Sequence, residues 1–275
     1  MTGPTDGPAS TRTATPAATV VVVRDHVDGL QVLLQERALA SDFVGGAWVF
    51  PGGKVDPRDA EVASERLGPV DLSAVHARLG AATPGETRAL LVAAVRETFE
   101  EAGLLLGTTH GRPVTSDDLA ADDVRATRQA LADRASDHDW RPFLDERDVV
   151  LDVGALRPLA WWITPHGLHR RFSTRFFVTG LPVEQDPAGH DDVEMTGTVW
   201  ETPAAALDAA RRGDRMVIFP TRRVLESLEE LPDVAAVLDH ADHDRFDLRP
   251  ILPLDRSRGC ELLVQHPDGG PPVDV

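Results

Sequence analysis

The sequence predicts an α/β fold, because runs that favour strands alternate along the chain with segments that favour helices. Residues 18–24 (ATVVVVR) are mostly β-branched, and residues 30–34 (LQVLL) follow a polar turn at 25–29, so these runs predict a pair of strands. Residues 47–50 predict a further short strand, and the clearest helix runs from Thr83 to about Ala102. A chain of 275 residues has room for one large domain or a domain with additions.

The rest of the chain continues this alternation and sets the expected domain limits. Strands are expected at 159–164, 171–181 and 199–201, and helices at 72–79, 116–136, 141–146, 203–212 and 221–231. Residues 1–17 are rich in Thr, Pro, Ala, Ser and Gly and predict a disordered tail. The folded domain is expected over 18–255, with 56–82 as a polar insertion, followed by an extension at 256–275 whose end is disordered.

Charge and composition exclude several classes of partner. The formal net charge of −17 argues against nucleic acid or an anionic membrane. The sequence has no apolar run of about twenty residues, so no membrane span is expected. The N-terminus lacks the basic start and apolar block of a secretory signal. Cys260 is the single cysteine, which rules out an internal disulfide and fits a reducing cytoplasm.

The helix predicted from Thr83 has clear start and stop signals. Thr83 can cap the helix, Pro84 suits the first turn, and Glu86 completes a capping box. Gly103 suits the residue just after the C-terminal end, where a left-handed backbone is common.

Three carboxylates occupy one face of this helix near its end. Glu97, Glu100 and Glu101 stand at i, i+3 and i+4, where like charges repel one another. Mg²⁺ or Mn²⁺ removes that repulsion, since a hard cation prefers carboxylate oxygens and keeps positions for phosphate oxygens and water. The alternative is a solvated acidic face, which is common in a chain with 45 Asp and Glu residues. The glycine turn Phe50-Pro51-Gly52-Gly53 upstream favours the metal site, and together the two features indicate metal-assisted cleavage of a phosphoanhydride.

The glycine turn and the run Arg96-Glu97-Thr98-Phe99-Glu100-Glu101-Ala102-Gly103-Leu104 together resemble the signature of the Nudix hydrolase family. That signature reads G, five residues, E, seven residues, then REUxEExGU, where U is a bulky aliphatic residue. The resemblance implies an α/β/α sandwich around a mixed β-sheet with extra helices, and hydrolysis of a nucleoside diphosphate linked to another group. It also implies Mg²⁺ or Mn²⁺ as cofactor and an anionic nucleotide-type substrate. A homodimer is a further expectation, because many relatives dimerise.

The sequence departs from this signature in three places. Asp59 stands where the signature has glutamate, the stretch from Asp59 to Arg96 is far longer than seven residues, and Thr98 occupies the first aliphatic position. In the family, the glutamate before the gap often orients the arginine. Here either Asp59 or Glu86 is the expected partner of Arg96.

A long insertion at this point is similar to one branch of the family, the peroxisomal coenzyme A diphosphatases and their bacterial relatives. Residues 162–165 (WITP), 170–177 (RRFSTRFF) and 220–221 (PT) are similar to further segments of that branch. A second coenzyme A pattern is matched before the glycine turn, although Asp42 stands where that pattern has an arginine. The resemblance therefore implies coenzyme A or acyl-CoA as substrate. The alternatives are ADP-ribose, NAD(H) or dinucleoside polyphosphates, and, in a different class, a non-catalytic nucleotide sensor.

The resemblance also implies roles for single residues. Glu97, Glu100 and Glu101 would hold the metal ions together with Gly53, and Arg96 belongs to the same catalytic set. The general base is expected to be Glu97 or Glu194. Substrate contacts, with arginines suited to bidentate phosphate binding, are expected from these residues: Arg37, Phe50, Gly52, Arg171 and Arg175.

Overall fold

The computed structural model describes residues 14–40, 44–81, 83–133, 135–164, 170–185 and 195–243. Eight strands form the main sheet: β1 (Thr15–His26), β2 (Gly29–Arg37), β3 (Ala47–Val49), β4 (Gly52–Lys54), β8 (Arg157–Ile163), β9 (Phe172–Gly180), β10 (Met195–Glu201) and β11 (Met216–Val217). The strand order is β11-β3-β2-β1-β9-β8, with β10 paired to β2 and β4 paired to β1. Because β1–β9 and β3–β11 are parallel while β1–β2 and β8–β9 are antiparallel, the sheet is mixed, as predicted.

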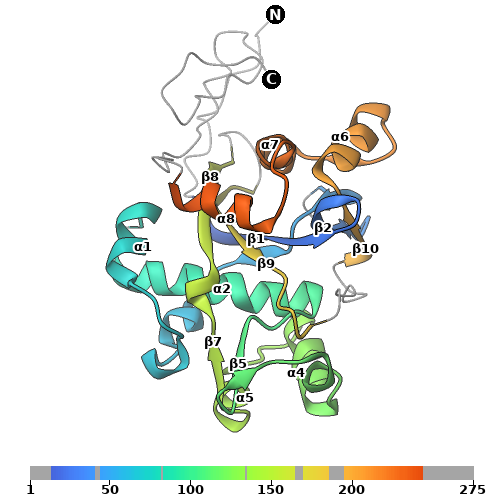
Figure 1. The fold of residues 1–275 in the computed structure, drawn as a ribbon. Coiled ribbons are helices and arrows are strands. Elements are labelled where there is room, and N and C mark those ends of the chain that lie inside the picture. The colour runs from blue at the N-terminus through green and yellow to red at the C-terminus, as the bar shows by residue number, and fades with distance from the viewer. Residues whose placement is uncertain are drawn as a thin grey trace, which may run out of the picture.

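Helices cover both faces of this sheet. They are α1 (Leu72–Leu79), α2 (Pro84–Ala102), α3 (Ser116–Leu119), α4 (Asp122–Ala132), α5 (Arg141–Glu146), α6 (Pro203–Arg212), α7 (Phe219–Leu228) and α8 (Val234–His243). One hydrophobic core joins the sheet to α1, α2, α4 and α5, and a second joins its other face to α6, α7 and α8 (Figure 1). This three-layer arrangement confirms the predicted α/β/α sandwich.

Strand β1 runs through the middle of the sheet and explains why its sequence is apolar throughout. Val20 and Val22 pack into the core under α2, whereas Val21 and Val23 pack into the core under α7 and α8. A strand covered on both faces gains from apolar residues at every position rather than at alternate ones. The strand begins at Thr15, three residues before the start expected from the sequence, and pairs there with the beginning of β9.

A second, three-stranded sheet lies below α2 and was not predicted. It consists of β5 (Gly107–Thr109), β6 (Arg112–Pro113) and β7 (Val149–Leu151) in the order β6-β5-β7. The segment 56–82 reaches this sheet, since Leu67 forms a bridge with Leu151 and Arg66 donates to Asp145 and Asp148. The insertion is therefore packed against the domain, with two 3-10 turns (Pro57–Glu61 and Ser64–Arg66) and the predicted helix α1. A third 3-10 turn spans Val153–Ala155.

Two helix predictions need correction. The single helix expected over 116–136 is two helices, α3 and α4, because a capping box between Thr115 and Asp118 starts the first and a new acidic first turn at Asp122 and Asp123 starts the second. Helix α7 begins at Phe219 and ends at Leu228, earlier at both ends than expected, and α8 was missed. By contrast, α1, α5 and α6 have the predicted limits.

Helix α2 begins and ends where its sequence signals place it. Thr83 is the N-cap and its side chain accepts a hydrogen bond from the backbone N–H of Glu86, and Gly103 follows the last turn with φ of 71°. Most of the helix is buried on every side, because the main sheet, α1, α4 and the Pro57–Glu61 turn all pack against it. The carboxylate face is thus enclosed by protein rather than open along its length.

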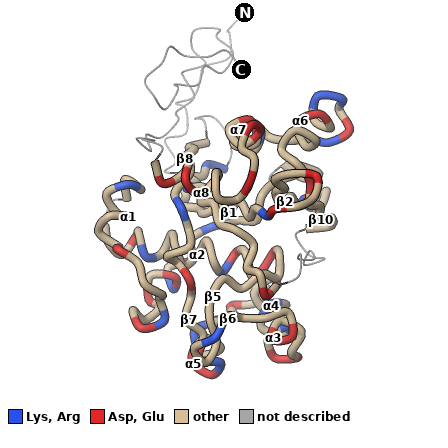
Figure 2. Tube along the Cα trace, in the orientation of Figure 1, with Lys and Arg blue, Asp and Glu red and all other residues tan. Residues whose placement is uncertain are grey.

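Charged positions are spread over most of the molecule. Figure 2 shows Asp and Glu on elements at every side, among them α3, α4, α5 and α7, with Lys or Arg beside many of them. Many of the arginines form ion pairs with nearby carboxylates, such as Arg112 with Asp118 and Arg147 with Asp123. None of the helices in the described part of the chain has the length and apolar content of a membrane span.

Candidate active site

The three predicted metal ligands lie on the last two turns of α2 and are nearly enclosed. Glu97, Glu100 and Glu101 are 8%, 9% and 2% exposed. Side chains on the sheet side of the same helix, among them Val95 and Ala102, are fully buried in the core. The helix therefore uses one side for packing and brings three carboxylates together on the other.

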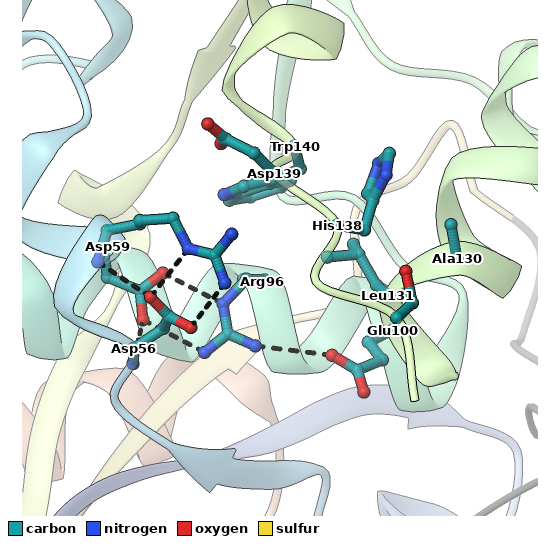
Figure 3. A pocket seen from close by; sticks show the side chains of 11 residues that line it. Asp56, Asp59, Arg96, Glu100, Ala130, Leu131, His138, Asp139 and Trp140 are labelled. Atoms are coloured by element: carbon teal, nitrogen blue, oxygen red, sulfur yellow. Dashed lines mark hydrogen bonds and ion pairs between the residues drawn. The ribbon is translucent and has the colours of Figure 1, made fainter. Parts of the chain in front are cut away.

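Arg96 lies at the centre of this carboxylate group and uses all of its N–H donors. Its Nε and Nη2 bind the two oxygens of Asp59 at 2.9 and 3.0 Å, and Nη2 also donates to the carbonyl of Lys54 at 2.9 Å. Nη1 approaches Glu97 at 2.9 Å and Glu100 at 3.3 Å, and Figure 3 shows the guanidinium between Asp59 and Glu100. Asp59, not Glu86, is therefore the partner of Arg96. Since its five N–H groups point to protein acceptors, we assign Arg96 a positioning role.

Burial and charge act in opposite directions on this network. Burial alone would lower the pKa of Arg96, but the charges of Glu97, Asp59 and Glu100 and the bonds to Asp59 raise it well above its usual value. Burial raises the pKa of Asp59, and the two bonds from Arg96 oppose that rise. The guanidinium is thus a fixed positive charge that partly compensates three carboxylates in a site with little water.

Glu101 lies deepest of the three glutamates, at 2% exposed. Burial raises the pKa of this carboxyl well above its usual range, and the charge of Glu97 raises it further, while Arg37 opposes both effects. Its Oε2 accepts a hydrogen bond of 2.7 Å from the backbone N–H of Gly52. A buried carboxylate repelled by its neighbours and held by a single backbone donor is the kind of group that a cation stabilises.

The glycine turn lies directly against the carboxylates. Gly52 and Gly53 belong to β4, which pairs with Thr19 and Ala18 of β1. A Cβ atom on Gly53 would lie 2.4–2.6 Å from the carboxylate atoms of Glu97, and one on Gly52 would lie 2.5 Å from the carbonyl oxygen of Ala18. Glycine is required at both positions, at Gly53 by the site and at Gly52 by the sheet.

Alanine substitutions should separate these two requirements. Gly53→Ala is expected to push the Glu97 carboxylate aside and to lower turnover by about 100-fold, the order that a misplacement of about 1 Å costs a catalytic site, with little change in thermal stability. Gly52→Ala meets backbone instead and should lower the free energy of unfolding by about 1–3 kcal/mol. Steady-state kinetics and thermal melts of the two variants check this, and unchanged turnover of Gly53→Ala would contradict the assigned contact.

The arginines predicted to contact substrate phosphate lie in different surroundings. Arg37, at the end of β2, is close enough to Glu101 for its charge to act on that carboxyl, so it lies beside the site. Arg171, just before β9, donates its Nε to the carbonyl of Thr164 at 3.0 Å. Glu194 and Asp42 lie outside the described residues. A role for Arg37 in binding phosphate therefore stays a prediction, with its position in favour.

The structure argues against two of the expected substrate contacts. Arg175 is 2% exposed and donates to the carbonyls of Leu79 and Gly80 at 3.2 and 3.4 Å, with its guanidinium 3.5 Å from the ring centroid of Trp161. Burial lowers the pKa of Arg175 to about 10. It caps the end of α1 and has no free face for phosphate. Phe50 is 2% exposed and packs in the core on the α7 side of the sheet, because the strand alternation turns its side chain away from α2.

A cavity of about 110 Å³ borders the carboxylates on the side of α4. Asp59, Arg96 and Glu100 form one wall, and residues of α4 and of the segment 136–140, including His138 and Trp140, form the others (Figure 3). The Arg96 network is therefore enclosed on the sheet side and borders a small polar space on the side away from β4.

The donor set fits a hard divalent cation. In the part of the chain that the structure describes, no three His, Cys, Asp or Glu side chains are gathered as a formed metal cluster, since Glu97 and Glu100 both turn to Arg96. All three glutamates nevertheless offer carboxylate oxygens, those of Glu97 and Glu101 beside the glycine turn, without the imidazole or thiolate ligands that zinc prefers. Burial first, and then the charge of Glu97, raise the pKa of Glu101, and Mg²⁺ or Mn²⁺ bound here would stabilise its ionised form.

Comparison with known families agrees with this geometry. Residues 61–222, more than half of the chain, match the family described as the NUDT19 Nudix domain. The chain belongs to the Nudix family. The match covers the whole of α2, so the three glutamates and Arg96 lie within the Nudix domain.

Curated relatives and a solved structure extend this assignment. The acyl-coenzyme A diphosphatase NUDT19 of Homo sapiens is 31% identical over 212 residues, which are 66% of this chain and 56% of the relative. The protein of the same name from Gallus gallus is 29% identical over 213 residues, which are 65% of this chain and 55% of the relative. This Nudix chain thus spans about half the length of the curated relatives it matches. A Nudix hydrolase crystal structure from Alicyclobacillus acidocaldarius is 28% identical, with a TM-score of 0.69, and covers 84% of this chain and 97% of its own.

Sequence reasoning missed two residues that donate to the backbone of the Nudix glutamates. Arg128 of α4 and Gln35 of β2 both donate to backbone carbonyls at the end of α2. Neither residue belongs to the Nudix signature, so their role depends on packing between elements that lie far apart in the sequence.

Proposed function

We propose that this chain is a divalent-metal-dependent Nudix diphosphohydrolase. Its best substrate is coenzyme A or an acyl-CoA, cleaved at the pyrophosphate to 3′,5′-ADP and (acyl-)phosphopantetheine. The observation that carries the proposal is the complete set of three glutamates at the end of α2: Glu97 and Glu100 contact Arg96, and Glu101 accepts from Gly52 of the glycine turn. The name of the NUDT19 relatives, acyl-coenzyme A diphosphatase, supports the substrate.

The site residues have three roles: some would bind the metal ion, some position the metal-binding glutamates, and some would contact phosphate or accept a proton. Glu97, Glu100 and Glu101, with Gly53, would hold Mg²⁺ or Mn²⁺. When bound, the cation neutralises the pyrophosphate and lowers the pKa of the attacking water. Arg96 and Asp59 keep Glu97 and Glu100 in position, and Arg37 lies where it can offer a guanidinium to phosphate. The water proton is taken by Glu97 or by Glu194.

The proposal includes the setting of the enzyme. The folded domain begins at Thr15, three residues before the expected start. It is proposed to extend to residue 255 with 56–82 as an insertion, and a homodimer is expected because many Nudix proteins dimerise. The single Cys260 supports a reducing cytoplasm. The net charge of −17 supports a small anionic substrate over nucleic acid. Metal ions and local arginines can offset the repulsion between protein and anion at one site, but not over the large surface that a nucleic acid would contact.

A substrate panel tests the proposal. Coenzyme A, acetyl-CoA, ADP-ribose, NADH and diadenosine polyphosphates are each incubated with the protein and Mg²⁺ or Mn²⁺, and phosphate release is followed with a coupled phosphatase. We expect preferential cleavage of the coenzyme A compounds, with 3′,5′-ADP as product, and no cleavage in the presence of EDTA. Activity on another nucleotide alone would keep the chemistry and replace the substrate. No activity with any compound and either metal would favour a nucleotide sensor.

A further inference from the structure

The C-terminal end of α2 is capped by side chains from two other elements of the fold, a neighbouring helix and a strand of the main sheet. The last carbonyls of a helix lack partners within the helix and need donors from elsewhere. Arg128 of α4 donates its Nε to the carbonyl of Glu100 at 2.9 Å and its Nη2 to the carbonyl of Glu101 at 2.8 Å. Gln35 of β2 donates its Nε2 to the same Glu101 carbonyl at 3.1 Å. The backbone of two predicted metal ligands is thus held from both sides.

Charge makes the position of Arg128 significant. The C-terminus of a helix carries a partial negative charge, which cations stabilise. At this end of α2 that charge adds to the carboxylates of Glu97, Glu100 and Glu101, which already repel one another. The guanidinium of Arg128 is bonded to the last backbone carbonyls and reduces this repulsion from the backbone side of the helix. Those bonds leave the carboxylate oxygens available to a cation.

The close approach of Arg128 depends on a glycine. A Cβ atom on Gly103 would lie 2.7 Å from Nη1 of Arg128, and Gly103 has a φ of 71°, which favours glycine. The glycine at the end of the Nudix signature therefore does two things here. It ends the helix, and it lets the guanidinium lie flat against the last turn.

Gln35 provides the second contact from the sheet. It is fully buried, and its Nε2 also lies 3.4 Å from Oγ1 of Thr198 on the neighbouring strand β10. Its Oε1 has no hydrogen-bond partner among the described residues. A buried glutamine with one unsatisfied oxygen is costly, so its presence requires a benefit that leucine at this place could not give. The contact with Glu101 is that benefit.

We propose that Arg128 and Gln35 are positioning residues, which fix the backbone of Glu100 and Glu101 so that their carboxylates are arranged for a divalent cation. The inference rests on the proposed function, because it assumes that these glutamates bind metal. It goes beyond that function by assigning two residues outside the Nudix signature to the affinity for the cation.

Binding of Mn²⁺ to the full chain without substrate tests this directly. Isothermal titration calorimetry or Mn²⁺ electron paramagnetic resonance gives the affinity of wild type, Arg128→Ala, Arg128→Lys and Gln35→Leu. We expect Arg128→Ala to weaken Mn²⁺ binding by about tenfold or more, the usual effect of removing a partner that orients metal ligands. Arg128→Lys keeps the charge and one donor and should recover part of the loss. In kinetics, the half-saturating Mn²⁺ concentration should rise while KM at saturating metal stays unchanged.

The matched control is Arg125→Ala on the same helix. Arg125 is 58% exposed and pairs with Asp122 of the same helix, so its loss should leave Mn²⁺ binding as in wild type. Gln35→Leu keeps volume and removes no charge, so it tests the idea even where Arg128→Ala fails to fold. Wild-type Mn²⁺ affinity in folded Arg128→Ala and in Gln35→Leu, in a protein that cleaves its substrate, would overturn the inference alone. Absence of Mn²⁺ binding by wild type would overturn the proposed function as well.

Discussion

Glu101→Gln is expected to lower kcat by about two to three orders of magnitude while the fold stays intact. Removing one charged ligand weakens the stabilisation of the transition state by several kcal/mol, and each 1.4 kcal/mol is about a factor of ten in rate. Glu100→Gln should have an effect of the same kind. The loss should appear in kcat as well as in the metal concentration required, because the ligand acts on the developing charge as well as on metal binding.

Stability should not fall in Glu101→Gln. Burial and the charge of Glu97 raise the pKa of Glu101, so ionising this carboxyl costs more free energy in the folded protein than in the unfolded chain. Glutamine removes that charge, and its amide oxygen can still accept the hydrogen bond from Gly52. Thermal unfolding is therefore expected at the wild-type temperature or above it.

Steady-state kinetics with Mg²⁺ and Mn²⁺, together with thermal melts, check both statements. Glu61→Gln is the matched control, because Glu61 is 57% exposed and pairs with Arg141 away from the site. It should behave as wild type. Wild-type turnover in both Glu100→Gln and Glu101→Gln would remove the metal assignment, whereas loss of folding would show that these carboxylates serve the structure first.

Asp59→Ala is expected to destabilise the protein by about 3–5 kcal/mol, the usual cost of removing one partner of a buried ion pair. Asp59 is 1% exposed and binds Arg96 with two hydrogen bonds. Without Asp59, the permanently charged guanidinium of Arg96 stays buried but loses two acceptors, one for Nε and one for an N–H of Nη2. Turnover should also fall, because Arg96 is then free to change its contacts with Glu97 and Glu100.

Chemical denaturation measures the free energy of unfolding of Asp59→Ala, and Asp137→Ala is the control. Asp137 also pairs with an arginine, Arg58, but its side chain is 93% exposed. Its removal should leave the unfolding midpoint unchanged within error, since exposed pairs are screened by water and salt. Equal effects of the two substitutions would contradict the view that the Asp59–Arg96 pair is the centre of the site.

The parts of the fold that were predictable are those with strong local signals. Thr83 and Gly103 define α2 through capping geometry, and the β-branched run at 18–24 gives β1. The carboxylate face followed from helical spacing alone. The second sheet escaped prediction because β5, β6 and β7 have two or three residues each, too few for a hydrophobic period to be recognised.

The choice between side-chain roles was not available from the sequence. Asp59 and Glu86 were equal candidates for Arg96, and only the packing of the Pro57–Glu61 turn against α2 selects Asp59. Arg175 was expected to meet phosphate because arginine so often does. Its position opposite Ala18 in β9 instead directs it to the end of α1, where burial and Trp161 hold it. Strand alternation similarly takes Phe50 into the core.

The placement of β1 has a consequence for how the chain reaches its native state. β1 leaves the ribosome long before its parallel partner β9, since Thr15 pairs with Phe172 and Val23 with Gly180. Until then, the run of valines from Val20 to Val23 has at most a hairpin with β2 to protect one edge. Such non-local pairing slows folding and exposes a segment with high aggregation propensity. The rate-limiting step of folding is therefore expected to be insertion of β9 beside β1, and chaperone dependence should be greatest for nascent chains that end before residue 180.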